Sequence, residues 1–426
     1  MQHSALTQID ISAEPETNPE HQDNAHELHV SVSHPQKNER GVQTYFTYRV
    51  NTKTSLQNYK QNNFSAIRRF SDFAFLHTCL ADAYPGAIVP PLPKKHSAQV
   101  STMRMSGVGC SPEWVEERRA HLQIFIQRVC AHPLLYTLPD VKLFLEASEE
   151  EFEARKQADK ERKSGAHTSM LDEVKGGLFS IGKSSMSLFG QETPASFEPQ
   201  GDIPCQQMYN YVAALEQHIA SVHRHSSRFI ERHRSLANST GSLGHSLSLL
   251  SDCERKISPN LAEAFSAMGL AMDGIATQLE EHANGEGVAF DGPLCDYIRQ
   301  LAQCRQAIDA RHTALAVLNA AGKTLALRRE KLAKLRSSTS ANEVTSERLS
   351  VASREVTEAE SLQTVARQEY EQVASRLDGE MARFQREKVS DFKRMVVDFL
   401  ELQLAFSGHM EAAWRNLLPS VKLVSE

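Results

Sequence analysis

The chain has 426 residues, 40% of them apolar, which is enough for two or three domains that each bury a core. No uncharged apolar stretch approaches the roughly 20 residues that cross a bilayer, so we expect no integral membrane protein. The first residues lack the basic start and apolar core of a secretory signal, which favours a cytoplasmic location.

The formal net charge of −6 is unevenly distributed. Residues 1–27 carry six Asp or Glu and no Lys or Arg, whereas residues 28–147 carry 14 Lys or Arg against eight Asp or Glu. The first segment is polar and poor in aromatic residues, a composition that predicts a disordered acidic tail. A basic module is therefore expected to follow it.

Residues 28–147 have the pattern of an α+β domain. Alternating, β-branched and aromatic residues predict strands at 28–33, 44–52 and 66–70. Apolar spacing predicts helices over 71–84, 113–130 and 140–147. Ser71 or Asp72 is the expected cap of the first helix, and prolines at 90, 91 and 93 predict an extended segment after it. We expect a three-stranded antiparallel sheet with helices.

Residues 148–204 have the composition of a linker, and GLFSIGKS at 177–184 matches the pattern of a phosphate-binding loop. That loop needs a strand before it and a helix after it, and AHTSMLDEVKG is not a strand, so a nucleotide hydrolase is not favoured. The same segment predicts an amphipathic helix near 177–190 that inserts into a membrane; the alternative is that its residues pack against the long helices or stay disordered. Its apolar residues are Leu178, Phe179, Ile181, Met186 and Phe189.

Residues 205–424 show helical periodicity over three long stretches, with apolar positions near a seven-residue repeat. Such helices must bury their apolar stripe against one another or a second chain, which predicts an all-α, three-helix dimerising bundle. The segment NSTGSLGHSLSLLS at 238–251 weakens the first helix and leaves its length open.

The sequence predicts no catalytic site, no cofactor and no metal. Neither a Ser-His-Asp nor a Cys-His arrangement lies in a motif that supports it. Several histidines occur in the first long helix, but their spacing favours surface or interface positions over metal ligands. These are His218, His223, His225 and His233.

Three short motifs give the basic module a family resemblance. RRFSDF at 68–73, PPLPKK at 90–95 and ERR at 117–119, in this order, resemble the PX domain, the phosphoinositide-binding module of sorting nexins. A polyanionic headgroup needs guanidinium and ammonium donors and a flat surface for its ring.

The resemblance implies a role for individual residues. Arg69 would grip the 3-phosphate, Phe70 would stack on the inositol with Ser71 nearby, and Arg118 would bind ring hydroxyls. Lys95 would meet the phosphate that links ring to glycerol, with Lys94 as the alternative.

The long helices resemble the dimerising BAR domain of retromer-associated sorting nexins, which carry an amphipathic helix between the two domains. The family implies a peripheral protein on the cytosolic face of endosomes that binds phosphatidylinositol 3-phosphate, senses or induces membrane curvature, and partners a retromer-type cargo-recognition complex but no nucleic acid. Its dimer could be with itself or with another BAR-containing sorting nexin.

A basic cluster near the end of the second long helix is a candidate membrane-binding tip, because each cation near anionic lipid contributes roughly 1 kcal/mol. It consists of Lys323, Arg328, Arg329, Lys331, Lys334 and Arg336. The alternative is a coiled-coil scaffold that docks through its PX module without remodelling membranes.

Overall fold

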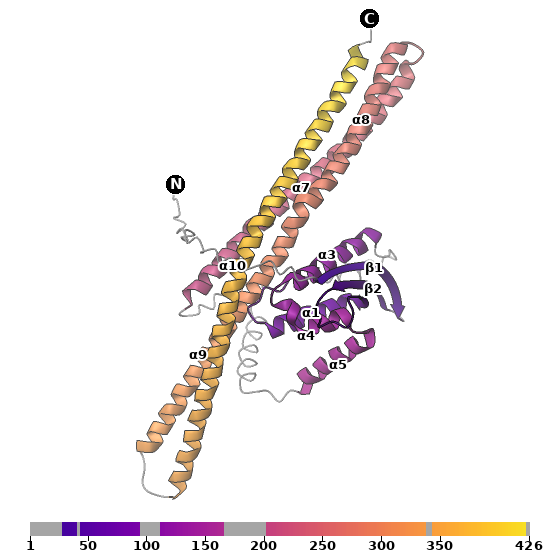
Figure 1. Cartoon of the computed structure of the whole chain (residues 1–426). Coiled ribbons are helices and arrows are strands. Elements are labelled where there is room, and N and C mark those ends of the chain that lie inside the picture. Colours follow the sequence, from indigo (N-terminus) through magenta and orange to yellow (C-terminus); the bar gives the residue numbers. More distant parts are fainter. Residues whose placement is uncertain (1–27, 41–42, 94–110, 166–201, 338–342, 423–426) are drawn as a thin grey trace, which may run out of the picture. The chain divides into compact units, whose positions relative to one another are not determined.

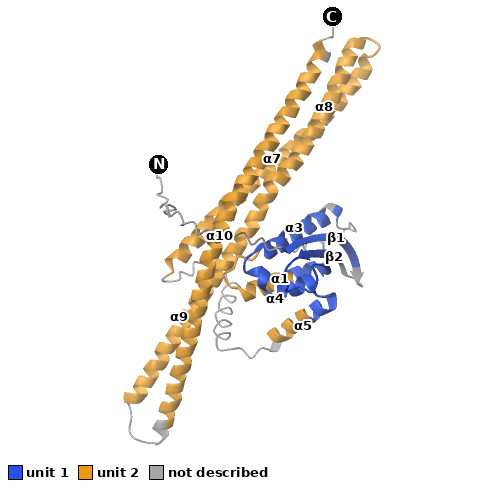
Figure 2. Cartoon of the chain, viewed as in Figure 1, with its two compact units in different colours: residues 1–73, 96–154 blue, residues 74–95, 155–426 orange. Residues whose placement is uncertain are grey.

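The structure, a computed structural model, describes residues 28–40, 43–93, 111–165, 202–337 and 343–422. Its chain forms two compact units (Figure 2), one from residues up to 73 with 96–154 and one from 74–95 with 155–426. Each unit is described by itself.

The first unit contains an antiparallel sheet in the order β1-β2-β3. Along β1 the side chains of Leu28, Val30 and Val32 are buried while His29 and Ser31 are exposed, the alternation expected of a half-buried strand. The predicted antiparallel sheet is thereby confirmed. The strands are β1 (Leu28–Arg40), β2 (Gln43–Thr54) and β3 (Asn63–Arg69).

Aromatic side chains join the helices of the first unit. Phe73 packs edge-on against Phe125 and Phe144, with ring centroids 6.2 and 4.9 Å away, and all three are fully buried. The helices are α1 (Phe70–Ala83), which continues into the second unit, α3 (Pro112–Ala131), the short η1 (Leu135–Thr137), α4 (Pro139–Glu146) and α5 (Glu149–Gly165).

The charged run after residue 148 is helical, although its composition suggested a linker. Ser148 and Glu151 form a reciprocal cap at the start of α5, because each side chain accepts a hydrogen bond from the other's backbone N–H, at 3.2 and 3.0 Å. The Ser-x-x-Glu spacing is the sequence signal that could have predicted this helix.

In the described part of the second unit, three long helices lie along one another (Figure 1). The middle one is continuous from α8 through a π-helical turn into α9, and the predicted three-helix domain is thereby confirmed. The elements are α7 (Ile203–Glu254), α8 (Pro259–Glu286), η2 (Gly287–Asp291), α9 (Gly292–Ser337) and α10 (Glu343–Lys422).

A proline explains the π-helical turn. Pro293 has no N–H to donate to the carbonyl four residues earlier, and its ring would collide with that carbonyl in a regular helix. The chain widens instead, and Gly292 donates its N–H to the carbonyl of Gly287, five residues back. The helix therefore passes Pro293 without ending.

Residues of the predicted proline segment pack on α10 within the second unit. The N–H of Ile88 donates to Glu380 Oε2 at 3.1 Å, and Arg376 donates to the carbonyl of Pro85. Gly86 between them has φ of +88°, a left-handed conformation in which a side chain would be strained. A Cβ at this position would also lie 2.9 Å from the carbonyl oxygen of Val373.

Helix α7 runs unbroken to Glu254, so the glycines at 238–251 do not shorten it. Gly244 lies against Gly269 of α8, where a Cβ on Gly244 would be 2.9 Å from the carbonyl oxygen of Gly269 and 2.6 Å from Asp273 Oδ1. Close backbone approach at this crossing offsets the low helix propensity of glycine. Gly241 is different, because a Cβ there would meet only the Cβ of Ala276 at 3.6 Å.

None of the helices in the described ranges combines the length and the apolar character that crossing a membrane requires.

We expect Gly244→Ala to destabilise the chain by roughly 1–3 kcal/mol, because the new methyl group forces α7 and α8 apart. Gly241→Ala is the matched control, and it should be neutral or stabilise by up to about 1 kcal/mol through helix propensity. Urea denaturation at one protein concentration measures both. Equal stabilities for the two variants would contradict the close glycine crossing.

Candidate functional site

The adjacent residues Arg68 and Arg69 point to opposite sides of β3, as strand geometry requires. Arg68 is 1% exposed and donates hydrogen bonds to the carbonyls of Phe144 at 2.8 Å, Leu143 at 3.3 Å and Ala147 at 2.6 Å. These carbonyls lie at the C-terminal end of α4, where that of Leu143 also accepts the N–H of Ala147 at 3.0 Å. Burial lowers the pKa of Arg68 to about 10, so it remains a cation at neutral pH. Arg68 is therefore a structural residue that holds α4 to the sheet.

Arg69 is the accessible cation of the pair, with a side chain 41% exposed. Its Nη2 lies 3.1 Å from Glu153 Oε2 on α5, and its Nε lies 3.5 Å from Asp72 Oδ1. Both carboxylates neutralise the guanidinium at an exposed position, where such pairs contribute little stability. An incoming phosphate dianion can replace Glu153 with two charge-assisted hydrogen bonds.

Asp72 fixes the backbone at this point. Helix α1 begins at Phe70, one residue before the predicted start, and the third helical residue Asp72 accepts the N–H of Arg69 at 2.9 Å. Asp72 is therefore not the N-cap that the sequence suggested but the residue that reaches back to it. This contact holds Arg69 at the junction of strand and helix.

Phe70 and Arg118 are in direct contact. The guanidinium carbon of Arg118 lies 4.0 Å from the centroid of the Phe70 ring and 4.9 Å from that of Trp114. Phe70 is half-buried and Ser71 is exposed, next in the chain. The structure thus brings an aromatic ring and a planar cation together at the residue that follows Arg69. A ring that can stack and a guanidinium that can donate hydrogen bonds are the groups that suit an inositol phosphate.

Other predicted site residues lie outside the described residues. These are Lys94 and Lys95, and the apolar set Leu178, Phe179, Ile181, Met186 and Phe189 of the GLFSIGKS segment. Their roles stay predictions.

The predicted basic cluster on α9 does not occupy one face. At roughly 100° per residue, Lys323, Lys331 and Lys334 lie opposite the buried Leu325 and Leu332, although the long side chain of Lys331 still reaches Glu355 of α10. The remaining cations, Arg328, Arg329 and Arg336, flank the buried stripe.

Acidic groups balance part of this cluster. Lys331 pairs with Glu355 at 3.0 Å, Arg329 pairs with Glu360 at 2.7 Å, and Arg328 donates to the carbonyl of Glu355. Lys334 pairs with Glu330 at 2.7 Å. The cluster is therefore a mixed-charge surface in which Lys323 is exposed.

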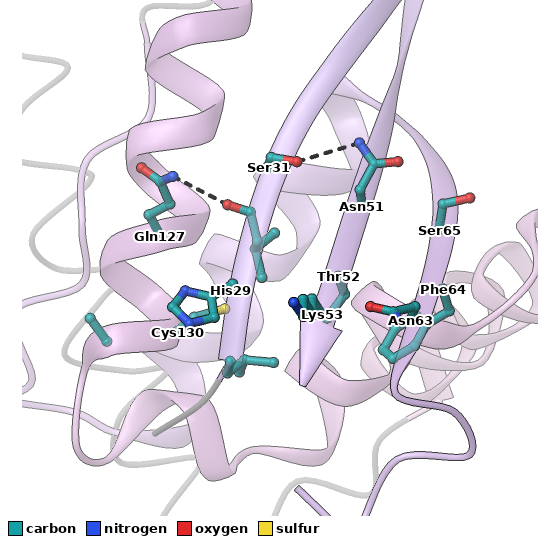
Figure 3. Close-up of a pocket in the computed structure, with 13 residues that line it drawn as sticks. His29, Ser31, Asn51, Thr52, Lys53, Asn63, Phe64, Ser65, Gln127 and Cys130 are labelled. Carbon is teal, nitrogen blue, oxygen red and sulfur yellow. Dashed lines mark hydrogen bonds between the residues drawn. The ribbon is translucent and has the colours of Figure 1, made fainter. Parts of the chain in front are cut away.

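A cavity of about 910 Å³ opens at the opposite end of the sheet strands from Arg69 (Figure 3). Neutral polar side chains such as Ser31, Asn51 and Asn63 line it, and Lys53 is its one cation among the described lining residues. None of the predicted headgroup ligands lines it. A single lysine does not match a polyanionic ring, so the Arg69 region remains the candidate site.

Two family models match the chain. The one described as PX domain matches residues 56–148, and the one described as Vps5 C terminal like matches residues 184–420. Neither description names a catalytic domain.

Similarity to known proteins extends over nearly the whole chain. Sorting nexin 1 of Arabidopsis thaliana is 30% identical over 397 residues, which is 93% of this chain and 92% of that protein. Sorting nexin-2 of Homo sapiens is 30% identical over 411 residues, covering 94% and 73%. A solved structure, the SNX-BAR Mvp1 tetramer, aligns with a TM-score of 0.66 at 16% identity over 91% of this chain and 99% of the other. The last likeness shows a shared fold.

We expect Arg68→Met to destabilise the first unit by roughly 3 kcal/mol, because the carbonyls that end α4 lose their buried charged donor. Arg69→Met, one residue away, should change stability by at most about 0.5 kcal/mol, because its ion pairs are exposed. Thermal unfolding followed by near-UV circular dichroism compares the two. A larger loss for Arg69→Met would refute the assignment of the buried role to Arg68.

Proposed function

Because the chain belongs to the sorting nexin family, with a PX domain and a Vps5-type C-terminal domain, and is accordingly a membrane-associated sorting protein, we propose that it binds phosphatidylinositol 3-phosphate on the cytosolic face of endosomes. We further propose that it dimerises through its long helices and bends membrane into tubules from which cargo is retrieved.

The observation that carries the lipid proposal is the grouping of Arg69, Phe70 and Arg118. Arg69 is half-exposed, and within the described ranges its guanidinium pairs with Asp72 and with the exposed Glu153, for which a phosphate can compete. Phe70 and Arg118 offer stacking and hydroxyl-binding groups in contact with each other. Once Glu153 is displaced, the positive charges of Arg69 and Arg118 favour an anion.

The dimer proposal rests on apolar side chains that no other helix of the described chain covers. Along α7 they recur every seventh residue, the period of a coiled-coil seam, and each is at least 42% exposed. They are Val222, Phe229, Leu236, Leu243 and Leu250. On α10, Leu400, Leu404 and Trp414 are also exposed. An apolar stripe of this length favours a second chain as its cover.

The proposals of curvature sensing and of a partner complex rest on membership of the sorting nexin family. Lys323, Lys331 and Lys334 are exposed on α9 and support contact with anionic lipid near the helix end, which for Lys331 and Lys334 requires exchange of their partners Glu355 and Glu330. A retromer-type complex is the proposed cargo-recognition partner, which co-purification from cells would test. A scaffold that docks without remodelling is the alternative, and electron microscopy of tubulated vesicles separates the two.

The lipid proposal predicts that Arg69→Ala abolishes sedimentation with vesicles that contain phosphatidylinositol 3-phosphate, because the principal phosphate donor is lost. Lys53→Ala is the matched control, since it removes an exposed cation of the same sheet that lines the other cavity. It should bind like the unmodified chain. Equal binding of all three proteins, or binding that ignores the lipid, would refute the site.

Glu153→Gln sharpens the same experiment. It removes the charge that competes with phosphate for Arg69 while preserving the shape of the side chain, so vesicle affinity should rise about two- to fivefold. Unchanged affinity would show that Glu153 does not compete.

The dimer proposal predicts that Leu236→Glu with Leu243→Glu converts the chain to a monomer, because two charges enter an apolar seam. Leu327→Glu, at a 67% exposed position on α9, is the control and should leave the assembly intact. Sedimentation velocity measures the mass. A monomeric unmodified chain would exclude a homodimer.

A further inference from the structure

Three metal-ligating side chains meet in the second unit, from two different helices. His282 and Glu286 lie one turn apart on α8, a spacing that places both on one face, and His233 approaches from α7. A donor atom of each lies within 4.8 Å of the others. Glu286 stands immediately before the π-helical turn, a kind of irregularity that often marks functional sites.

The imidazole of His282 is buried without a hydrogen-bond partner. The residue is 3% exposed, and neither ring nitrogen forms a hydrogen bond to any residue that the structure describes. Nε2 lies 3.1 Å from Glu286 Oε1, which is an ion pair when the ring is protonated, and the ring stacks on Phe406 at 3.9 Å. A neutral buried imidazole without a hydrogen-bond partner is costly, so the ring favours a ligand.

Glu286 is a buried carboxylate, 1% exposed. His233 Nδ1 lies 2.8 Å from its Oε2, and Gln403 of α10 donates to its Oε1 at 2.7 Å. Within the described ranges its ion-pair partners are His233 and His282, which carry a positive charge only when protonated, and no lysine or arginine pairs with it. A buried negative charge needs compensation by a cation.

One bound cation would satisfy both groups. We propose that His233, His282 and Glu286 bind a divalent transition-metal ion, with Zn²⁺ the best match. Two imidazoles and one carboxylate are ligands that zinc takes in tetrahedral sites, with nitrogen and oxygen about 2.0–2.2 Å from the metal. Donor atoms around such an ion lie roughly 3.3 Å apart, which side-chain rotation alone can reach from the present spacing.

The ion would join α7 to α8 at the level where α10 supplies Gln403 and Phe406. The fourth position would take water or the amide oxygen of Gln403. Because His233 is 18% exposed at its side chain, an ion can enter from solvent past this residue. The site is distinct from the Arg69 region and belongs to the helical domain.

Zinc binding is tested on the full chain after dialysis against a chelator and return to metal-free buffer. Isothermal titration with Zn²⁺ should show one ion per chain, and the melting temperature should rise with added zinc by mass action. Co²⁺ in place of Zn²⁺ should give the visible absorption of a tetrahedral site with nitrogen ligands.

His282→Gln and Glu286→Gln should each weaken zinc binding by at least tenfold and abolish the cobalt spectrum. His225→Gln is the matched control, because this histidine is exposed on the same helix as His233 and should bind zinc like the unmodified chain. Far-UV circular dichroism checks that each variant is folded. Equal zinc affinity across all variants, or no thermal shift with zinc, would overturn the proposal. Since lipid binding is measured separately, failure here leaves the headgroup site unaffected.

Discussion

The helical domain depends on one buried carboxylate, Asp202. It caps α7 by accepting the N–H of Cys205, and it also accepts hydrogen bonds from Arg311 of α9 at 2.7 and 2.9 Å and from Tyr370 of α10 at 2.9 Å. Burial acts most strongly on Asp202 and alone would raise its pKa, yet the donors from Arg311, Tyr370 and Cys205 hold that pKa below its ordinary value. The three long helices therefore share a charged contact that exists only in their native register.

This contact sets the axial alignment from which the other features follow. With α7, α9 and α10 fixed at Asp202, the glycine crossing of Gly244 and Gly269 falls where the two helices approach most closely. The π-helical turn lies between these two points, so the chain can pass Pro293 and still bring Glu286 against α7 and α10. Apolar packing supplies most of the stability, while the polar contacts select one register among several that a heptad pattern allows.

Local signals in the sequence predicted the secondary-structure elements. The roles of individual residues depend on contacts between residues far apart in the chain. Strand alternation and helical spacing located most of the sheet and the helices, but β1 runs to Arg40 where the predicted strand ended at 33, and α5 lies in the predicted linker. The motif RRF indicated two arginines but could not separate them, because the role of Arg68 depends on carbonyls 75 to 79 residues later in the chain. Histidine spacing within α7 likewise did not indicate that His233 could be a metal ligand, because its neighbours His282 and Glu286 belong to α8. Sequence periodicity describes faces of helices, and the relative register of two helices requires the structure.

Binding at the proposed lipid site would be weak, and dimerisation through the helical domain would compensate for that weakness. Binding a phosphate at Arg69 exchanges an ion pair with Glu153 for one with the headgroup, so much of the gain is offset. A chain with one such site would bind transiently, whereas two sites on one dimer make the second contact intramolecular and raise overall affinity by about 10²–10⁴. That gain is lost when the spacing of the sites does not match the surface. Modest headgroup affinity coupled to a dimer would thus make recruitment depend on lipid density and membrane shape together.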